Sequence, residues 1–158
     1  MRGKSVIMKI VETPNIAIIS KDESFHAFLK YHFEDCYDLH HIENERDAAS
    51  KVKAMQPAII IASNDAGLDF LVESKSISPK SQRILMTDNP SKLDFEKAVN
   101  RAEVFRMMSL PFDVDKVSRI FDEATLIYAE RIERENETER LRKVSQQLEF
   151  QLRQSLIG

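Results

Sequence analysis

The sequence of 158 residues contains one cysteine and three glycines, and it has no excess of positive charge. Because Cys36 is alone, no disulfide can form within the chain, which favours a reducing compartment. The glycines, Gly3, Gly67 and Gly158, are too far apart to form a glycine-rich phosphate loop. The net charge of -3 argues against the broad basic surface that nucleic acid or an anionic membrane would need.

The sequence also lacks a long apolar run. The apolar residues near the start are interrupted by Lys9, and they are too few for a signal core or a membrane span. Residues 1–13 are therefore assigned to an N-terminal extension. With 42% hydrophobic and 31% charged residues, the whole chain has the composition of one globular domain with a full core. We expect a cytoplasmic protein without a direct nucleic-acid or membrane partner.

Five short apolar segments alternate with segments of helical period. Nearly continuous apolar runs, such as 57–62 and 82–87, are typical of strands buried on both faces. Between the strands, apolar residues recur three or four positions apart, which is the spacing of one helix face. The predicted strands are 15–20, 37–42, 57–62, 82–87 and 104–109. The predicted helix faces are, in chain order, Phe25, Phe28, Leu29 and His32; Ala48, Val52 and Met55; and Phe95, Ala98, Val99 and Ala102. The last of these helices is predicted to start at Pro90, with Asn89 as its cap.

Repeated strand and helix units predict an α/β fold, a doubly wound five-stranded parallel sheet with helices on both faces. Binding sites in this architecture lie at the carboxyl ends of the strands. The residues predicted at that edge are Ser20, Lys21, Ser63, Thr87, Asp88, Ser109 and Leu110.

The chain from Asp113 onward has neither proline nor glycine before its last residue, which predicts one long helix. At ~1.5 Å per residue this helix would extend ~65 Å, far beyond the preceding domain. Its apolar residues follow a spacing of three and four, which predicts a parallel two-stranded coiled coil and hence a homodimer, although the polar middle leaves antiparallel pairing open. The predicted interface is Ile120, Ala124, Ile127, Leu141, Leu148 and Leu152, interrupted by Arg131, Arg134 and Thr138.

Residues 14–127 resemble the receiver domain of two-component response regulators. The resemblance is carried by "PAIIIAS" before "AGLDFL", by "ILMT" in the fourth strand, and by "FRMMSLPFD" after the fifth. The tail, residues 128–158, resembles receivers whose last helix continues as a coiled coil to an output domain. In relatives of that type the output is often a cyclic-nucleotide or cyclic-di-GMP enzyme. The resemblance implies a flavodoxin-like receiver fold, a role in signal transduction, and an output domain or signalling protein as partner.

A phosphorylated receiver needs five residues at its strand ends. An acidic pair after the first strand binds Mg²⁺, and an aspartate ending the third strand accepts the phosphoryl group. A threonine or serine ends the fourth strand, and a lysine precedes a proline after the fifth. In this chain the acidic positions hold Ser20 and Lys21, or Lys21 and Asp22 if the register shifts by one. Ser63 replaces the aspartate, and Thr87 is retained at the end of the fourth strand. Leu110 stands in place of the lysine before Pro111.

Three or four of the five positions thus lack the required residue, and each substitution disfavours phosphorylation. Lys21 places a positive charge where Mg²⁺ needs a carboxylate. Ser63 is a poor nucleophile without an adjacent base, and Leu110 removes the charge that would stabilise a transferred phosphoryl group. Met107 stands where receivers carry an aromatic switch residue. We expect a pseudo-receiver with no catalytic residue, metal or cofactor, acting as a phosphorylation-independent dimerisation and protein-interaction module.

Other interpretations of the same residues stay open. The emptied pocket is a candidate sensor for a small ligand or anion near Lys21, Ser63 and Thr87. An acidic pocket rebuilt from Asp22, Asp65 and Asp88 is disfavoured, because loop aspartates commonly serve as caps. Lys21 is a candidate ion-pair partner of Asp65 or Asp88. The adjacent pair His40 and His41 lacks further metal ligands, which favours a structural role.

Overall fold

The computed structural model describes residues 13–157 except 44, 88, 90–95 and 110, and the side chains of 45 and 64–66 lie outside this description. A single sheet of five parallel strands has the order β2-β1-β3-β4-β5. The strands are β1 (Asn15–Ile19), β2 (Asp38–Ile42), β3 (Ile59–Ser63), β4 (Gln82–Thr87) and β5 (Arg106–Ser109). The predicted parallel sheet is confirmed, and no strand end differs from its prediction by more than two residues.

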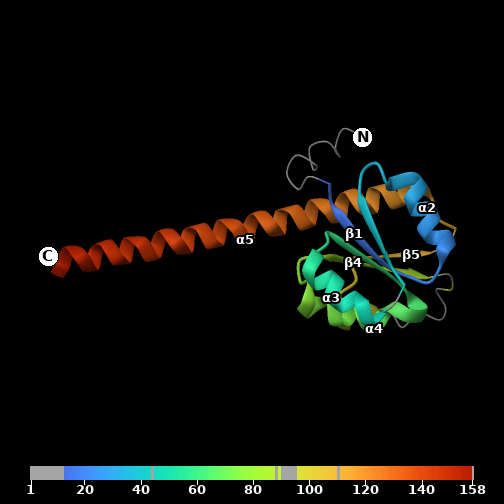
Figure 1. The fold of residues 1–158 in the computed structure, drawn as a ribbon, viewed down its shortest axis with the longest axis horizontal. Coiled ribbons are helices and arrows are strands. Elements are labelled where there is room, and N and C mark those ends of the chain that lie inside the picture. Colours follow the sequence, from blue (N-terminus) through green and yellow to red (C-terminus); the bar gives the residue numbers. More distant parts are fainter. Residues whose placement is uncertain (1–12, 44, 88, 90–95, 110, 158) are drawn as a thin grey trace.

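Helices cover both faces of this sheet (Figure 1). The helices α2 (Glu23–Phe33) and α5 (Val114–Ile157) pack on one face; α3 (Glu45–Met55), α4 (Asn64–Ile77) and the short π-helix η2 (Lys97–Arg101) pack on the other. The doubly wound arrangement predicted from the alternating pattern is therefore confirmed. It places the carboxyl ends of the strands at one edge and their amino ends at the opposite edge.

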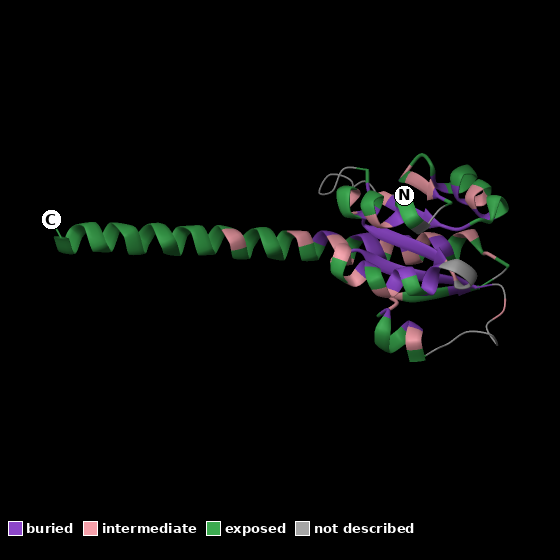
Figure 2. Ribbon diagram, turned by 60° about the horizontal axis from the view of Figure 1, so that its bottom comes forward, coloured by how far each residue is buried: buried purple, intermediate pink, exposed green. Residues whose placement is uncertain are grey.

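The central strand β3 shows why its sequence is continuously apolar. Ile59 and Ile61 point into the core under α2 and α5, whereas Ile60 and Ala62 point into the core under α3 and α4. All four side chains are fully buried. The central strands are correspondingly coloured as buried in Figure 2. Because each face of this central strand meets a helix layer, apolar side chains occupy every position before Ser63, where the strand ends.

The segment between β4 and β5 differs in part from its prediction. Ala98 and Ala102 are buried as expected, but Val99 is 53% exposed. Here the chain forms the π-helix η2 rather than an α-helix, and its wider turn rotates Val99 out of the core. Asn89, the predicted cap, is described and belongs to no helix or strand, whereas Pro90 and residues 91–95 lie outside the described residues, so the predicted helix start stays a prediction.

The long helix predicted from Asp113 is confirmed as α5, with 44 residues. Its first part packs on the sheet, and beyond Ile132 its residues are almost all exposed (Figure 2). Ala124 is fully buried in the core and Ile120 packs against it, so Ala124 was wrongly assigned to the dimer interface. The reason is that a straight α-helix drifts ~20° per heptad from a seven-residue repeat, and four heptads separate Ala124 from Leu152.

Two contacts hold α5 where it leaves the domain. The hydroxyl of Tyr128 donates to the carbonyl of Gln56 at 2.8 Å, and Lys80 forms an ion pair with Glu135. Gln56 follows α3 and Lys80 precedes β4, so both anchors lie at the amino edge of the sheet. The exposed part of α5 therefore departs from the edge opposite the strand carboxyl ends (Figure 1).

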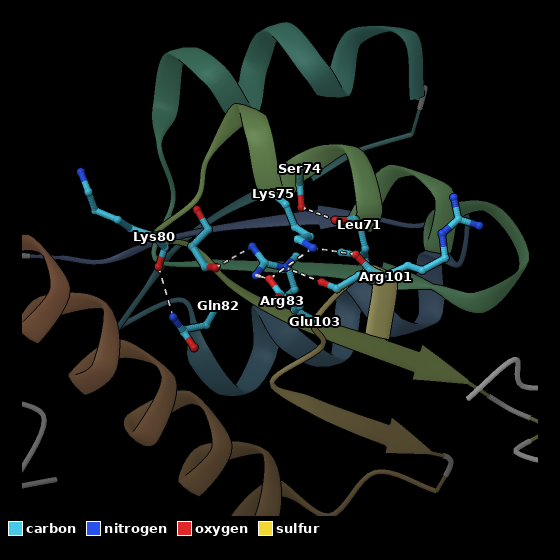
Figure 3. Close-up of polar contacts among 10 residues, drawn as sticks. Leu71, Ser74, Lys75, Lys80, Gln82, Arg83, Arg101 and Glu103 are labelled. Atoms are coloured by element: carbon cyan, nitrogen blue, oxygen red, sulfur yellow. Dashed lines mark hydrogen bonds and ion pairs between the residues drawn. The ribbon is translucent and has the colours of Figure 1, made fainter. Parts of the chain in front are cut away.

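A buried arginine joins β4 to the segment that follows η2 (Figure 3). Arg83 is 6% exposed; its Nε donates to the carbonyl of Ala102 at 2.7 Å and its Nη1 to the carbonyl of Ser81 at 3.2 Å. Glu103, with a positive φ of 50°, lies 4.0 Å from Nη2 of Arg83 and 3.3 Å from Lys75. Burial lowers the pKa of Arg83, against the opposing effect of Glu103.

Candidate functional site

The predicted polar residues do gather at the strand carboxyl ends. Ser20 directly follows β1, Ser63 is the last residue of β3, and Thr87 is the last residue of β4. Strand pairing sets Ser63 beside Met86 and Thr87 beside Ser109. We call Ser20, Ser63 and Thr87 the hydroxyl site. The strand ends establish the position of the hydroxyl site at this edge. That the site corresponds to a degenerate phosphorylation pocket remains a prediction.

The strand β3 ends at Ser63 and the helix α4 begins at the next residue, with no loop between them. It is the N-cap of α4, with extended φ and ψ of -78° and 151°, yet its side chain makes no capping hydrogen bond. One turn later Gly67 lies against Ala62, and a Cβ at position 67 would collide with the Cβ of Ala62. The start of α4 is thus pressed onto the end of β3, which leaves Ser63 half-buried at the site.

The residues after β1 are held by local hydrogen bonds. The hydroxyl of Ser20 accepts the backbone N–H of Asp22 at 3.0 Å. A carboxylate oxygen of Asp22 caps α2 by accepting the N–H groups of Ser24 at 2.9 Å and Phe25 at 3.3 Å. Lys21 between them is exposed. Asp22 therefore serves as the cap of a helix, the role that the sequence favoured for the loop aspartates.

The remaining predicted positions divide into described and undescribed residues. Thr87 is 5% exposed, and its hydroxyl accepts the backbone N–H of Asn89 at 3.1 Å. Leu110, Asp88 and the side chain of Asp65 lie outside the described residues, so the predicted ion pair of Lys21 stays a prediction. Among the side chains that are described, no three of the His, Cys, Asp or Glu type are grouped closely enough to hold a metal ion.

A histidine pair beside Ser20 was not foreseen. The rings of His26 on α2 and His41 on β2 stack with centroids 4.3 Å apart and an angle of 16°. Nε2 of His41 lies 2.6 Å from the carbonyl oxygen of Ser20, to which it donates. Nδ1 of His26 is buried and has no hydrogen-bond partner. Burial, followed by the proximity of His41 and Lys30, lowers the pKa of His26.

This pair should make the domain less stable in acid. His26 binds a proton less tightly in the folded chain than in the unfolded chain. Its protonation therefore does not change the free energy of unfolding above the ordinary pKa of 6.5, where His26 is neutral in both states. Stability is then lost as the pH falls from 6.5 to the lowered pKa of the folded state. We expect His26→Phe, which keeps the stack and removes the titrating group, to reduce this loss.

Urea denaturation between pH 7.5 and 5 measures the effect, with the same substitution at His32 as the control. His32 is exposed on the same helix, so His32→Phe controls for the addition of a phenylalanine to α2. Equal slopes in the original chain and His26→Phe would refute the assignment.

No sequence signal pointed to the stack, because His26 and His41 lie on different elements and meet only after β2 has paired with β1. His40, by contrast, has the structural contacts expected of a strand histidine. Its Nε2 lies 3.2 Å from the side-chain oxygen of Asn15 and 3.4 Å from a carboxylate oxygen of Asp38.

Comparison with known proteins finds similarity in structure rather than in sequence. No protein-family model and no curated protein matches the chain. Within the described residues, no helix is long and apolar enough to cross a membrane.

Many solved structures have the same fold. The signal receiver domain of an HD domain-containing protein from Pseudomonas fluorescens Pf-5 superposes with a TM-score of 0.72 at 22% identity, covering 77% of this chain and 93% of that one. A receiver domain protein from Methanospirillum hungatei JF-1 gives 0.69 at 14%, covering 75% and 98%. The receiver domain of a diguanylate cyclase from Desulfovibrio desulfuricans G20 gives 0.64 at 19%, covering 73% and 96%. The chain thus has the fold of a response-regulator receiver domain.

Proposed function

We propose that the chain is a non-catalytic receiver-fold module for signal transduction, which dimerises through the exposed part of α5 without a phosphorylation cycle. The observation that carries the proposal is Ser63, a hydroxyl at the carboxyl end of β3, where a phosphorylated receiver carries its aspartate. The hydroxyl groups of Ser20 and Thr87 are engaged by neighbouring backbone N–H groups. These contacts support a site that holds loops in place instead of binding a phosphoryl group.

The far end of the molecule supports the dimer. Leu141, Leu148 and Leu152 are each at least 60% exposed on a helix that has left its own domain. Such a row of exposed apolar side chains on a helix is typically covered by a partner helix. An output domain joined to, or associated with, the paired helices would then be held in fixed spacing, by analogy with receivers that precede a cyclase or HD domain.

Light scattering on the chain, with and without Mg²⁺ and beryllofluoride, tests the proposal. Beryllofluoride mimics a phosphoryl group on aspartate, and Ser63 offers it no carboxylate. We expect the same concentration-dependent dimer under all conditions. A monomer that assembles only when Mg²⁺ and beryllofluoride are present would show that a working phosphorylation site exists and would overturn the proposal.

A second candidate function is an anion sensor at the hydroxyl site. It is favoured by one observation: Ser63, the N-cap of the 14-residue helix α4, makes no capping hydrogen bond with its side chain, so the first N–H groups of α4 are not satisfied by that hydroxyl. Thermal denaturation with inorganic phosphate, compared with sodium chloride of equal ionic strength, separates the two functions. A melting temperature raised by phosphate alone, and not in Ser63→Ala, would favour the sensor.

A further inference from the structure

We propose that two copies of the chain pair in parallel over residues 138–157, with Glu137 of each copy facing Arg142 of the other, while the helices stay apart over residues 130–135. The proposal rests on the dimer proposed above and on the parallel pairing predicted from the sequence, and it adds the register and the point where the two helices separate.

The first argument is the direction of the apolar side chains on α5. Leu148 follows Phe121 by 27 residues, which is about 7.5 turns at ~3.6 residues per turn. Phe121 is fully buried against the sheet, so Leu148 points to the opposite side, away from its own domain. At about 100° per residue in an α-helix, Leu141 lies about 20° around the helix from Leu148, and Leu152 lies about 40° from it. Both side chains are at least 60% exposed. This stripe is free to meet a second helix without a clash between domains.

The second argument is the heptad that the stripe defines. With Leu141, Leu148 and Ser155 at d, the a positions hold Thr138, Ser145 and Leu152. In a parallel pair, each g residue faces the e residue of the following heptad on the partner helix. Glu137 is at g and Arg142 is at e, so a symmetric pair of opposite charges forms.

Both charged groups are accessible for that contact. In the single chain Glu137 pairs with Arg140, and Arg142 pairs with Glu139, each three residues away on the exposed helix surface. Such local pairs on an exposed helix surface contribute little to stability, so a partner helix can share or replace them.

The third argument is that the same register brings like charges together closer to the domain. Arg131 at a and Arg134 at d would each face its own copy, and Glu130 at g would face Glu135 at e. Glu135 also forms an ion pair with Lys80 of its own domain. Close packing of the two helices is opposed by the like charges at positions a and d and by the repulsive pair between positions g and e. The helices therefore separate on the domain side of Thr138.

Disulfide cross-linking tests orientation and register. In a Cys36→Ser background, Ser155→Cys should form a covalent dimer on mild oxidation, because residue 155 faces its own copy in a parallel pair. Gln146→Cys lies on the outer side of the helix and Arg134→Cys lies in the separated part, so both should cross-link at least tenfold more slowly. In an antiparallel pair with Leu141 opposite Leu152, residue 155 faces residue 138; cross-links confined to a mixture of Thr138→Cys and Ser155→Cys would overturn the proposal.

Charge reversal tests the ion pair. Glu137→Arg places two repulsive contacts in each dimer, and we expect the dissociation constant to rise about tenfold at low salt. Arg142→Glu should do the same, and the double variant should return to within about twofold of the original chain. Arg153→Glu, on the outer side, is the matched control and should have no effect. Equal affinities for all four variants would refute the pairing of Glu137 with Arg142.

The two proposals fail in different ways. A chain that stays monomeric at every concentration would refute the proposed dimerisation itself. A dimer that lacks the Ser155→Cys cross-link and is indifferent to charge reversal would leave dimerisation standing and refute only the parallel, partly separated arrangement.

Discussion

Replacement of both Leu141 and Leu148 by aspartate is expected to abolish the proposed dimer, raising its dissociation constant more than a hundredfold. Each leucine is 60% exposed in the single chain, and neither belongs to the core of the folded domain. In the dimer four leucine side chains leave water, and at about 1.5–3 kcal/mol for complete burial of one such side chain, the partial burial of four supplies several kcal/mol. Four buried carboxylates would add an opposing desolvation penalty.

Analytical ultracentrifugation measures the loss, and circular dichroism shows that the domain still unfolds at its original temperature. The matched control is Phe150→Asp. Phe150 is 63% exposed, but it lies nine residues after Leu141, half a turn around the helix at about 100° per residue. It should leave dimerisation intact. A double variant that still dimerises, or a Phe150→Asp variant that does not, would place the interface on another face.

Replacement of Arg83 by methionine is expected to destabilise the domain by about 3 kcal/mol, within the range for removing one partner of a buried polar network. Methionine fills most of the volume but donates no hydrogen bond, so the buried carbonyls of Ala102 and Ser81 lose their donors. Glu103 also loses its ion pair with β4, in which its carboxylate lies 4.0 Å from Nη2 of Arg83. Arg83→Lys should be intermediate, because an ammonium group cannot donate in two fixed directions as a guanidinium does.

Urea denaturation at pH 7 measures this change, with Arg119→Met as the control. Arg119 is exposed on α5, and its replacement should alter stability by less than about 0.5 kcal/mol. If Arg83→Met proved as stable as Arg119→Met, the segment after η2 would not depend on the arginine.

The hydroxyl site and the histidine pair differ in how far the sequence could predict them. Ser20, Ser63 and Thr87 were foreseen, because each follows or ends an apolar run and parallel strands bring such ends to one edge. The stack of His26 on His41 was not, because it joins a helix to an edge strand and depends on how α2 is packed. Arg83 lies inside an apolar strand, and only its fit to two carbonyls explains its burial.

The two halves of α5 show the same division. A spacing of three and four runs through Ala124 and through Leu148, so the sequence alone assigned both to one seam. The structure separates them, because the sheet covers Ala124 and leaves Leu148 exposed. A heptad pattern reports that a helix has an apolar side, and it does not report whether a sheet or a second helix covers that side.

By itself, the sequence determined the order and type of the elements, the parallel sheet, the long final helix and the absence of an acid at the end of β3. These features follow from local periodicity, composition and chain connectivity, which are written in neighbouring residues. The tertiary structure alone decided which part of α5 belongs to the core, which histidines touch, and how a buried arginine is satisfied. Those contacts join residues far apart in the chain, and they depend on the distances and angles at which whole elements pack.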